Sequence, residues 1–200
     1  TGNIVIYKAS DNSAVETIDV TSGQIAGSGS TQITINPSSD LAEQTEYYVQ
    51  IAATAFDDSY GNSYTGISDT TTLSFTTADE TAPTITGPSG SAGSSTSTKS
   101  IDENSTSVYT FSVNETVTWS LNGGADASLF AINTSTGALS FSSAPDYESP
   151  GDSDSDNSYV VVVRATDSAG NASDQTLTVS IADADEVSPT ISSFSPADNA

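Results

Sequence analysis

The sequence predicts an all-β protein made of β-sandwich domains in tandem. Its apolar residues are mostly Val, Ile, Leu, Tyr and Phe in short runs, and Ser, Thr, Asp, Asn and Gly separate these runs. This is the composition of strands joined by tight turns, not of long helices. A hydrophobic fraction of 34% is low for one large core in 200 residues. Small sandwiches in series therefore fit better than a single domain.

An internal repeat supports this division of the chain. The run Asp79-Glu-Thr-Ala-Pro-Thr-Ile85 recurs 106 residues later as Asp185-Glu-Val-Ser-Pro-Thr-Ile191. A second echo pairs Asp58-Ser-Tyr-Gly-Asn62 with Asp167-Ser-Ala-Gly-Asn171, and an alternating strand pattern follows each. A period of this length is the size of an immunoglobulin-like sandwich.

The complete module is predicted over residues 81–186. Apolar and polar residues alternate in six runs, with a short lead strand near Thr84: 108–113, 117–121, 129–132, 138–141, 159–166 and 175–181. Period-two alternation indicates strands with one buried face. Glycine-containing turn signals such as Asn122-Gly-Gly124 separate the runs. Seven strands are enough for a sandwich.

The first module, residues 1–80, has strand patterns at 3–8, 14–20, 31–36, 46–53 and 71–77. Compared with its neighbour it lacks its first strand or strands. Residues 187–200 look like the lead strand of a third module. We therefore expect an internal fragment of a longer tandem array, cut out of frame with the domain boundaries.

The charge balance excludes several functions. Asp and Glu number 26 against three cations, Lys8, Lys99 and Arg164, for a formal net charge of −23. Such a chain repels nucleic acid and anionic membranes, and no apolar stretch is long enough to cross a membrane. The chain has no Cys and no His. Disulfides, thiolate chemistry, His-dependent nucleophiles and the usual zinc ligand sets are thereby excluded, and an enzyme is not expected.

Two stretches of the chain resemble known families. Residues 1–80 resemble the bacterial Ig-like repeats of S-layer and giant surface proteins, through Gly2-Asn-Ile-Val-Ile-Tyr7, Asn36-Pro37, Thr45-Glu-Tyr-Tyr48 and Ser74-Phe-Thr-Thr77. Residues 81–186 resemble a bacterial cadherin-like domain, through Asp102-Glu-Asn104, Leu129-Phe-Ala-Ile-Asn133, Asp146-Tyr-Glu148, Ala165-Thr-Asp167 and Ala182-Asp-Ala-Asp185. The resemblance implies tandem immunoglobulin-like and cadherin-like Greek-key sandwiches, secreted or displayed on a bacterial cell surface.

The cadherin resemblance also implies calcium. By motif, it places ligands at the exit end of the second module (Glu103, Asp146, Glu148, Asp183 and Asp185) and at the junction with the incoming linker (Asp167, Asp79 and Glu80). Ca²⁺ takes 6 to 8 oxygen ligands, and carboxylates gathered at a junction repel one another unless a cation lies among them. The exit linker lacks the Asn residues of animal cadherins, and Asn114-Glu115 stands where paired aspartates are expected, which implies fewer ions per junction. The alternative left open is that these acids only solvate loop ends.

An acidic loop, Asp152-Ser-Asp-Ser-Asp-Asn157, resembles the start of an EF-hand. The match ends at position six, where Asn157 replaces the required Gly, and at position twelve, where Val163 replaces the bidentate Glu. A solvated loop is favoured here, with a local calcium site as the alternative.

Aromatic residues divide into core and surface candidates. Trp119 alternates with Val117 and Leu121 and is predicted to lie in the core. Tyr60 and Tyr64 are the pair to test for ligand contact. The leading interpretation is a calcium-stiffened stalk or spacer of a large surface or adhesion protein, and the alternative is a glycan- or protein-binding module that acts through loops of the first sandwich. Neighbouring repeats are the expected partners, with residues 188–200 donating a strand to another copy.

Overall fold

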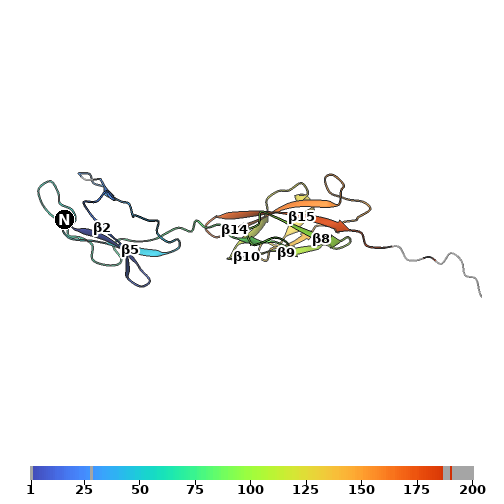
Figure 1. Cartoon of the computed structure of the whole chain (residues 1–200), viewed down its shortest axis with the longest axis horizontal. Helices are drawn as coiled ribbons and strands as arrows, with labels where there is room; N and C mark the ends of the chain where they lie inside the picture. Colours follow the sequence, from blue (N-terminus) through green and yellow to red (C-terminus); the bar gives the residue numbers. More distant parts are fainter. Residues whose placement is uncertain (1, 28, 187–189, 191–200) are drawn as a thin grey trace, which may run out of the picture. The chain divides into compact units, whose positions relative to one another are not determined.

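The structure is a computed structural model that describes residues 2–27, 29–186 and 190. The chain divides into two compact units, Thr1–Glu80 and Thr81–Ala200, which are drawn together in Figure 1 and are taken separately below. Among the described residues the regular structure is β-strand apart from one short 3₁₀ helix, so the all-β prediction is confirmed. None of the helical structure in this part of the chain is long and apolar enough to cross a membrane.

The first unit is built on a four-stranded sheet of order β2-β1-β5-β6, with a small separate pair β3-β4. The bounds are β1 Asn3–Lys8, β2 Ser13–Asp19, β3 Ile25–Ala26, β4 Thr34–Ile35, β5 Glu46–Ile51 and β6 Ser74–Thr76. Every pairing is antiparallel. The strands predicted from alternation are all present, while β3 was not predicted.

The core of the first unit follows the alternation of β1. Ile4 and Ile6 are buried and pack with Ile18, Tyr47 and Val49. Strand side chains alternate between the two faces of a sheet, so one face of β1 supplies the core.

The second unit contains sheets of order β11-β14-β15-β8, β12-β13-β9 and β10-β7. The bounds are β7 Ile85–Thr86, β8 Thr96–Asp102, β9 Ser107–Thr110, β10 Ser112–Val113, β11 Thr118–Leu121, η1 Ala127–Leu129, β12 Phe130–Ile132, β13 Ala138–Phe141, β14 Ser158–Thr166 and β15 Ala172–Ala182. Strands that follow one another along the chain change sheets, as from β11 to β12 and from β13 to β14. This is the connectivity of a sandwich rather than of a single meander.

A strictly alternating strand forms the centre of this core. Tyr159, Val161, Val163 and Ala165 of β14 are buried, and the residues between them are half-buried. The ring of Tyr159 meets that of Phe141 in β13 edge-on, with centroids 5.1 Å apart, so the two larger sheets pack face to face. Trp119 is 3% exposed and belongs to the same core, as predicted.

Strand β8 was not predicted from the sequence. Its residues are mostly Thr, Ser, Lys and Asp, yet it pairs in parallel with β15 along its whole length. A buried polar contact joins the two strands. Gln175 of β15 is fully buried, accepts a hydrogen bond from Ser97 Oγ at 3.0 Å, and donates one to the Ser94 carbonyl at 2.7 Å. A buried amide is tolerated when it is hydrogen-bonded in this way. Strand β8 can therefore pair with β15 although most of its residues are polar.

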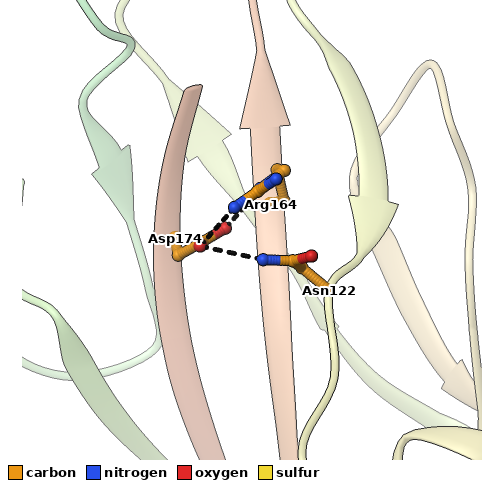
Figure 2. Close-up of polar contacts among 3 residues, drawn as sticks. All are labelled: Asn122, Arg164 and Asp174. Atoms are coloured by element: carbon orange, nitrogen blue, oxygen red, sulfur yellow. Dashed lines mark hydrogen bonds and ion pairs between the residues drawn. The ribbon is translucent and has the colours of Figure 1, made fainter. Parts of the chain in front are cut away.

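One of the three cations of the chain lies on the outer surface of this sheet. Arg164 of β14 donates two hydrogen bonds to the carboxylate of its register partner Asp174 in β15, and Asn122 donates a third (Figure 2). The Arg164 and Asp174 side chains are 38% and 37% exposed. An ion pair this exposed stabilises a fold by about 0 to 1 kcal/mol. It holds two strands in register without forming a functional centre.

Candidate metal centre

Glu103, the first residue after β8, is the buried member of an acidic cluster at the exit end of the second unit, formed with Asp146 and Glu148. It is 4% exposed. Its Oε2 accepts a hydrogen bond from the Tyr147 N–H at 2.8 Å, and its Oε1 accepts one from the Ala184 N–H at 2.9 Å. These two hydrogen bonds lower the pKa of Glu103 more than its burial raises it, so the side chain is held ionised. One carboxylate thus ties the segment after β13 to the segment that leaves β15.

Two more predicted acids lie beside Glu103. Asp146, Glu148 and Glu103 each offer a carboxylate oxygen, and these oxygens lie within 4.8 Å of one another. Asp146 is oriented locally, because its Oδ1 accepts a hydrogen bond from the Ser149 N–H at 3.0 Å. The Asn104 N–H donates to the Pro145 carbonyl at 3.0 Å and so anchors the segment that carries both acids. Glu103 is therefore brought into one group with two acids that lie 43 and 45 positions later in the sequence.

Electrostatic repulsion acts within this group. A hydrogen bond from its own backbone lowers the pKa of Glu148, but burial and the carboxylates of Glu103, Asp183 and Asp146 together raise it. Asp183 therefore lies within electrostatic reach of Glu148. Carboxylates that disfavour one another's ionisation are relieved by a bound cation. The donor set is all oxygen, which fits Ca²⁺ and does not fit a metal that needs nitrogen or sulfur.

Not every predicted exit residue joins this group. Asp185 is exposed in the segment after β15 and is not one of the three clustered acids. Glu186 was not predicted, yet its Oε1 accepts a hydrogen bond from Asn104 Nδ2. Asn104 has a φ of 62°, a left-handed conformation that Asn tolerates better than most residues. In the sequence, the contact between Asn104 and Glu186 is indicated only by the presence of an Asn directly after Glu103.

Asp167, predicted for the incoming junction, has a structural role of its own. Its Oδ1 accepts hydrogen bonds from the N–H groups of Ala169, Gly170 and Asn171 at 2.8, 2.7 and 2.9 Å, and its Oδ2 accepts one from Asn171 Nδ2 at 2.8 Å. Burial raises the pKa of Asp167, but these hydrogen bonds outweigh it and lower the value overall. The carboxylate closes the turn between β14 and β15.

The repeated motif Asp-x-x-Gly-Asn is this same turn in both units. In the first unit Asp58 Oδ1 accepts from the N–H groups of Tyr60 and Asn62, and its Oδ2 accepts from Asn62 Nδ2. The glycines, Gly61 and Gly170, have φ values of 83° and 97°, where a side chain would be strained. The sequence echo therefore records a turn geometry.

One acid near Asp167 was missed. Glu115 and Asp167 offer carboxylate oxygens within 4.8 Å of each other. The sequence showed Glu115 only as a departure from the expected paired aspartates. Asp79 and Glu80 follow β6 at the end of the first unit. That they share an ion with Asp167 stays a prediction.

The fold and this cluster define a class: tandem β-sandwich units with an acidic group where the last strand of the second unit ends. Residues 2–77 match the family model of the bacterial Ig-like domain, which confirms the resemblance stated for residues 1–80. A comparison with curated proteins finds no match.

Solved cadherin structures are similar to the chain. Drosophila N-cadherin EC1-3 is 18% identical with a TM-score of 0.41, over 92% of this chain and 56% of that one. Mouse cadherin-23 EC22-24 is 16% identical with a TM-score of 0.43, over 90% and 53%. The third cadherin domain of human protocadherin 7 is 23% identical with a TM-score of 0.37, over 52% of this chain and 100% of that one. The chain thus spans only about half of the two multi-domain cadherin structures.

Proposed function

We propose that the chain is a calcium-stiffened spacer segment of a large extracellular protein at a bacterial surface. Acids at the exit end of the second unit would bind Ca²⁺ together with groups of the following repeat. The role is mechanical rather than catalytic: it separates a distal binding region from the cell. Neighbouring repeats of the same protein are the partners.

One observation carries this proposal. The buried, ionised Glu103 bridges the Tyr147 and Ala184 N–H groups, with Asp146 and Glu148 oxygens within 4.8 Å. Because Ala184 lies in the segment that leaves the last strand, an ion bound here would be held against that segment. Rigid attachment of the outgoing segment is what a spacer requires. The family match of residues 2–77 supports the bacterial source of the array.

The test compares the thermal midpoints of the wild type and Glu148→Gln, first in chelator and then in calcium. The difference between the two proteins should have opposite signs in the two conditions. Trp119 is the single tryptophan of the chain and is buried in the second unit, so its fluorescence reports the unfolding of that unit. In chelator, Glu148→Gln should raise the thermal midpoint, because the raised pKa of Glu148 means that its charge is disfavoured in the folded state. In calcium, the wild type should be the more stable protein.

The calcium effect has an expected size. Extracellular calcium modules have Kd values of roughly 10⁻⁴ to 10⁻³ M. At about 10 mM calcium, binding to the folded state alone then stabilises it by about 1.4 to 2.7 kcal/mol. Glu46→Gln is the matched control, since it removes the same charge from an exposed position in β5 of the first unit. If the unfolding midpoint followed by Trp119 fluorescence does not change across millimolar calcium, the proposal is wrong.

The first unit favours a second candidate function, direct binding of a glycan or protein. Tyr60 is 90% exposed on the Asp58–Asn62 turn, and Tyr64 just beyond it is 41% exposed. Exposed aromatic rings present an apolar face with a polar end, which suits sugar and protein contacts. A pure spacer should bind nothing, so a glycan array together with a protein pull-down separates the two candidates.

Strand donation between copies is a further part of the proposal. The predicted donor is the segment 188–200. Apart from Thr190 it lies outside the described residues, and so do its two large apolar residues, Ile191 and Phe194. Among the described strands β6 lies at the end of its sheet, with Phe75 39% exposed. An edge strand with an exposed aromatic side chain can accept a donated strand.

A further inference from the structure

The acidic loop before β14 gathers charge as closely as the exit cluster does. Asp152, Asp154 and Asp156 each offer a carboxylate oxygen, and these oxygens lie within 4.8 Å of one another. Three carboxylates at this separation repel one another. Exposed acids often lie close together without any ion, so their proximity alone does not make a site.

The burial of Asp152 sets this loop apart from ordinary surface acids. Asp152 is only 7% exposed. Its Oδ2 accepts a hydrogen bond from the Asp156 N–H at 2.9 Å. Its Oδ1 is buried and accepts no hydrogen bond from any residue that the structure describes. Leaving a buried carboxylate oxygen without a donor is costly, and a cation would remove that cost.

A second oxygen in the loop shares this condition. Asn157 Oδ1 is buried and has no hydrogen-bond donor among the described residues, whereas its Nδ2 donates to the Tyr147 carbonyl at 2.9 Å. The amide is thus oriented with its oxygen unsatisfied. Carboxylate and amide oxygens are the ligands that Ca²⁺ prefers.

The loop is held in place by an acid that sequence reasoning missed. Asp126 is 3% exposed, and its two oxygens accept hydrogen bonds from the Ser153 and Val160 N–H groups, both at 2.8 Å. These bonds attach the start of the loop, and the beginning of β14 that follows it, to a buried carboxylate of the second unit. The three aspartates are therefore arranged before any ion arrives, which reduces the cost of binding.

Backbone geometry removes one objection raised by the sequence. Asn157 stands where an EF-hand requires Gly, but its φ is 63°, the left-handed conformation for which Gly is selected. Val163, which replaces the bidentate Glu of an EF-hand at position twelve, is fully buried in β14 and cannot be a ligand. The loop therefore supplies part of a coordination shell, and water must complete it.

We propose that the loop 152–157 binds a calcium ion of its own, within the second unit and without a neighbouring repeat. The ligands are the carboxylates of Asp152, Asp154 and Asp156, and the buried Asn157 amide oxygen of the same loop is a further candidate. This site and the exit cluster share no acid, although Asn157 contacts the segment that carries Asp146 and Glu148 through its hydrogen bond to the Tyr147 carbonyl. The loop site would stiffen the unit itself rather than its junction.

Calorimetric titration of the whole chain with Ca²⁺ after treatment with chelator tests the proposal. Asp154→Asn is the principal variant because Asp154 is exposed and its loss leaves no buried group unpaired. It should remove one binding site or raise its Kd by at least about tenfold, since ligand charge sets affinity in such loops. Asp152→Asn should do the same. Glu148→Gln, which acts at the exit cluster, should leave the loop site intact.

The outcomes separate this proposal from the spacer proposal. Loss of a site in Asp154→Asn but not in Glu148→Gln supports the loop, and additive losses in the double variant support both sites. Equal stoichiometry and affinity in Asp154→Asn and the wild type would overturn the loop site and leave the exit site untouched. Equal Trp119 unfolding midpoints in chelator, or a higher one for Asp154→Asn, confirm that the variant folds.

Discussion

The substitution Asp126→Asn tests whether a single buried side chain holds the acidic loop. Asp126 is 3% exposed and accepts hydrogen bonds from the Ser153 and Val160 N–H groups. Asn keeps one acceptor oxygen and replaces the other with an NH₂ group that faces an N–H donor. One of these partly buried N–H groups thus loses its partner.

The size of the effect follows from that lost hydrogen bond. A buried donor left unsatisfied costs about 1 to 3 kcal/mol. For a domain near 100 residues, each kcal/mol lowers the thermal midpoint by about 4 to 8 °C. Asp126→Asn should therefore lower the midpoint of the second unit by at least about 4 °C in chelator. It should also weaken the loop calcium site, because the start of the loop and the beginning of β14 are no longer both fixed.

The assay is Trp119 fluorescence during heating, in chelator and then in calcium. Asp154→Asn is the matched control, since it removes the same charge from an exposed position in the loop that Asp126 contacts. If Asp126→Asn and the control unfold at the same temperature in chelator, the two hydrogen bonds contribute nothing and the reasoning is wrong. If stability falls while calcium affinity is unchanged, Asp126 supports the fold but does not position the loop.

Three further predictions concern other parts of the chain. Glu103→Gln should lower the midpoint of the second unit even in chelator, because one of the Tyr147 and Ala184 N–H groups loses its acceptor; an effect seen only with calcium would contradict this. Asp167 has a pKa below its ordinary 3.8, so its contribution to stability is complete above that pH and is lost as the pH falls through the folded-state value. Asp167→Asn should accordingly be less stable than the wild type at pH 7 in chelator, and the difference should vanish in a pH series taken below 3.8. Removal of residues 187–200 should abolish any self-association seen by light scattering, and association that survives the truncation would rule out strand donation.

Local patterns in the sequence were enough for much of the fold. The alternation over 159–166 corresponds to β14, whose inward side chains form the centre of the second core. Alternation is readable because each strand residue takes its face from its neighbours along the chain. Strand β8 lacks this signal because its one buried side chain is polar, Ser97, which is hydrogen-bonded to Gln175, and Ile101 is its only apolar residue. Such a strand is defined by its pairing with β15, which no local pattern records.

The acids at the exit end were selected from motif positions, and the structure brings Glu103, Asp146 and Glu148 together. The role of Asp126 could not be predicted, because its partners Ser153 and Val160 lie 27 and 34 positions away. The all-β class, the turn motif at Asp58 and Asp167, and the set of candidate acids could all be read from the order of the residues. Which oxygens are buried, paired or without a donor depends on the packed fold. Hydrogen bonding and desolvation depend on distances across the sandwich, and those distances exist only once the strands have packed.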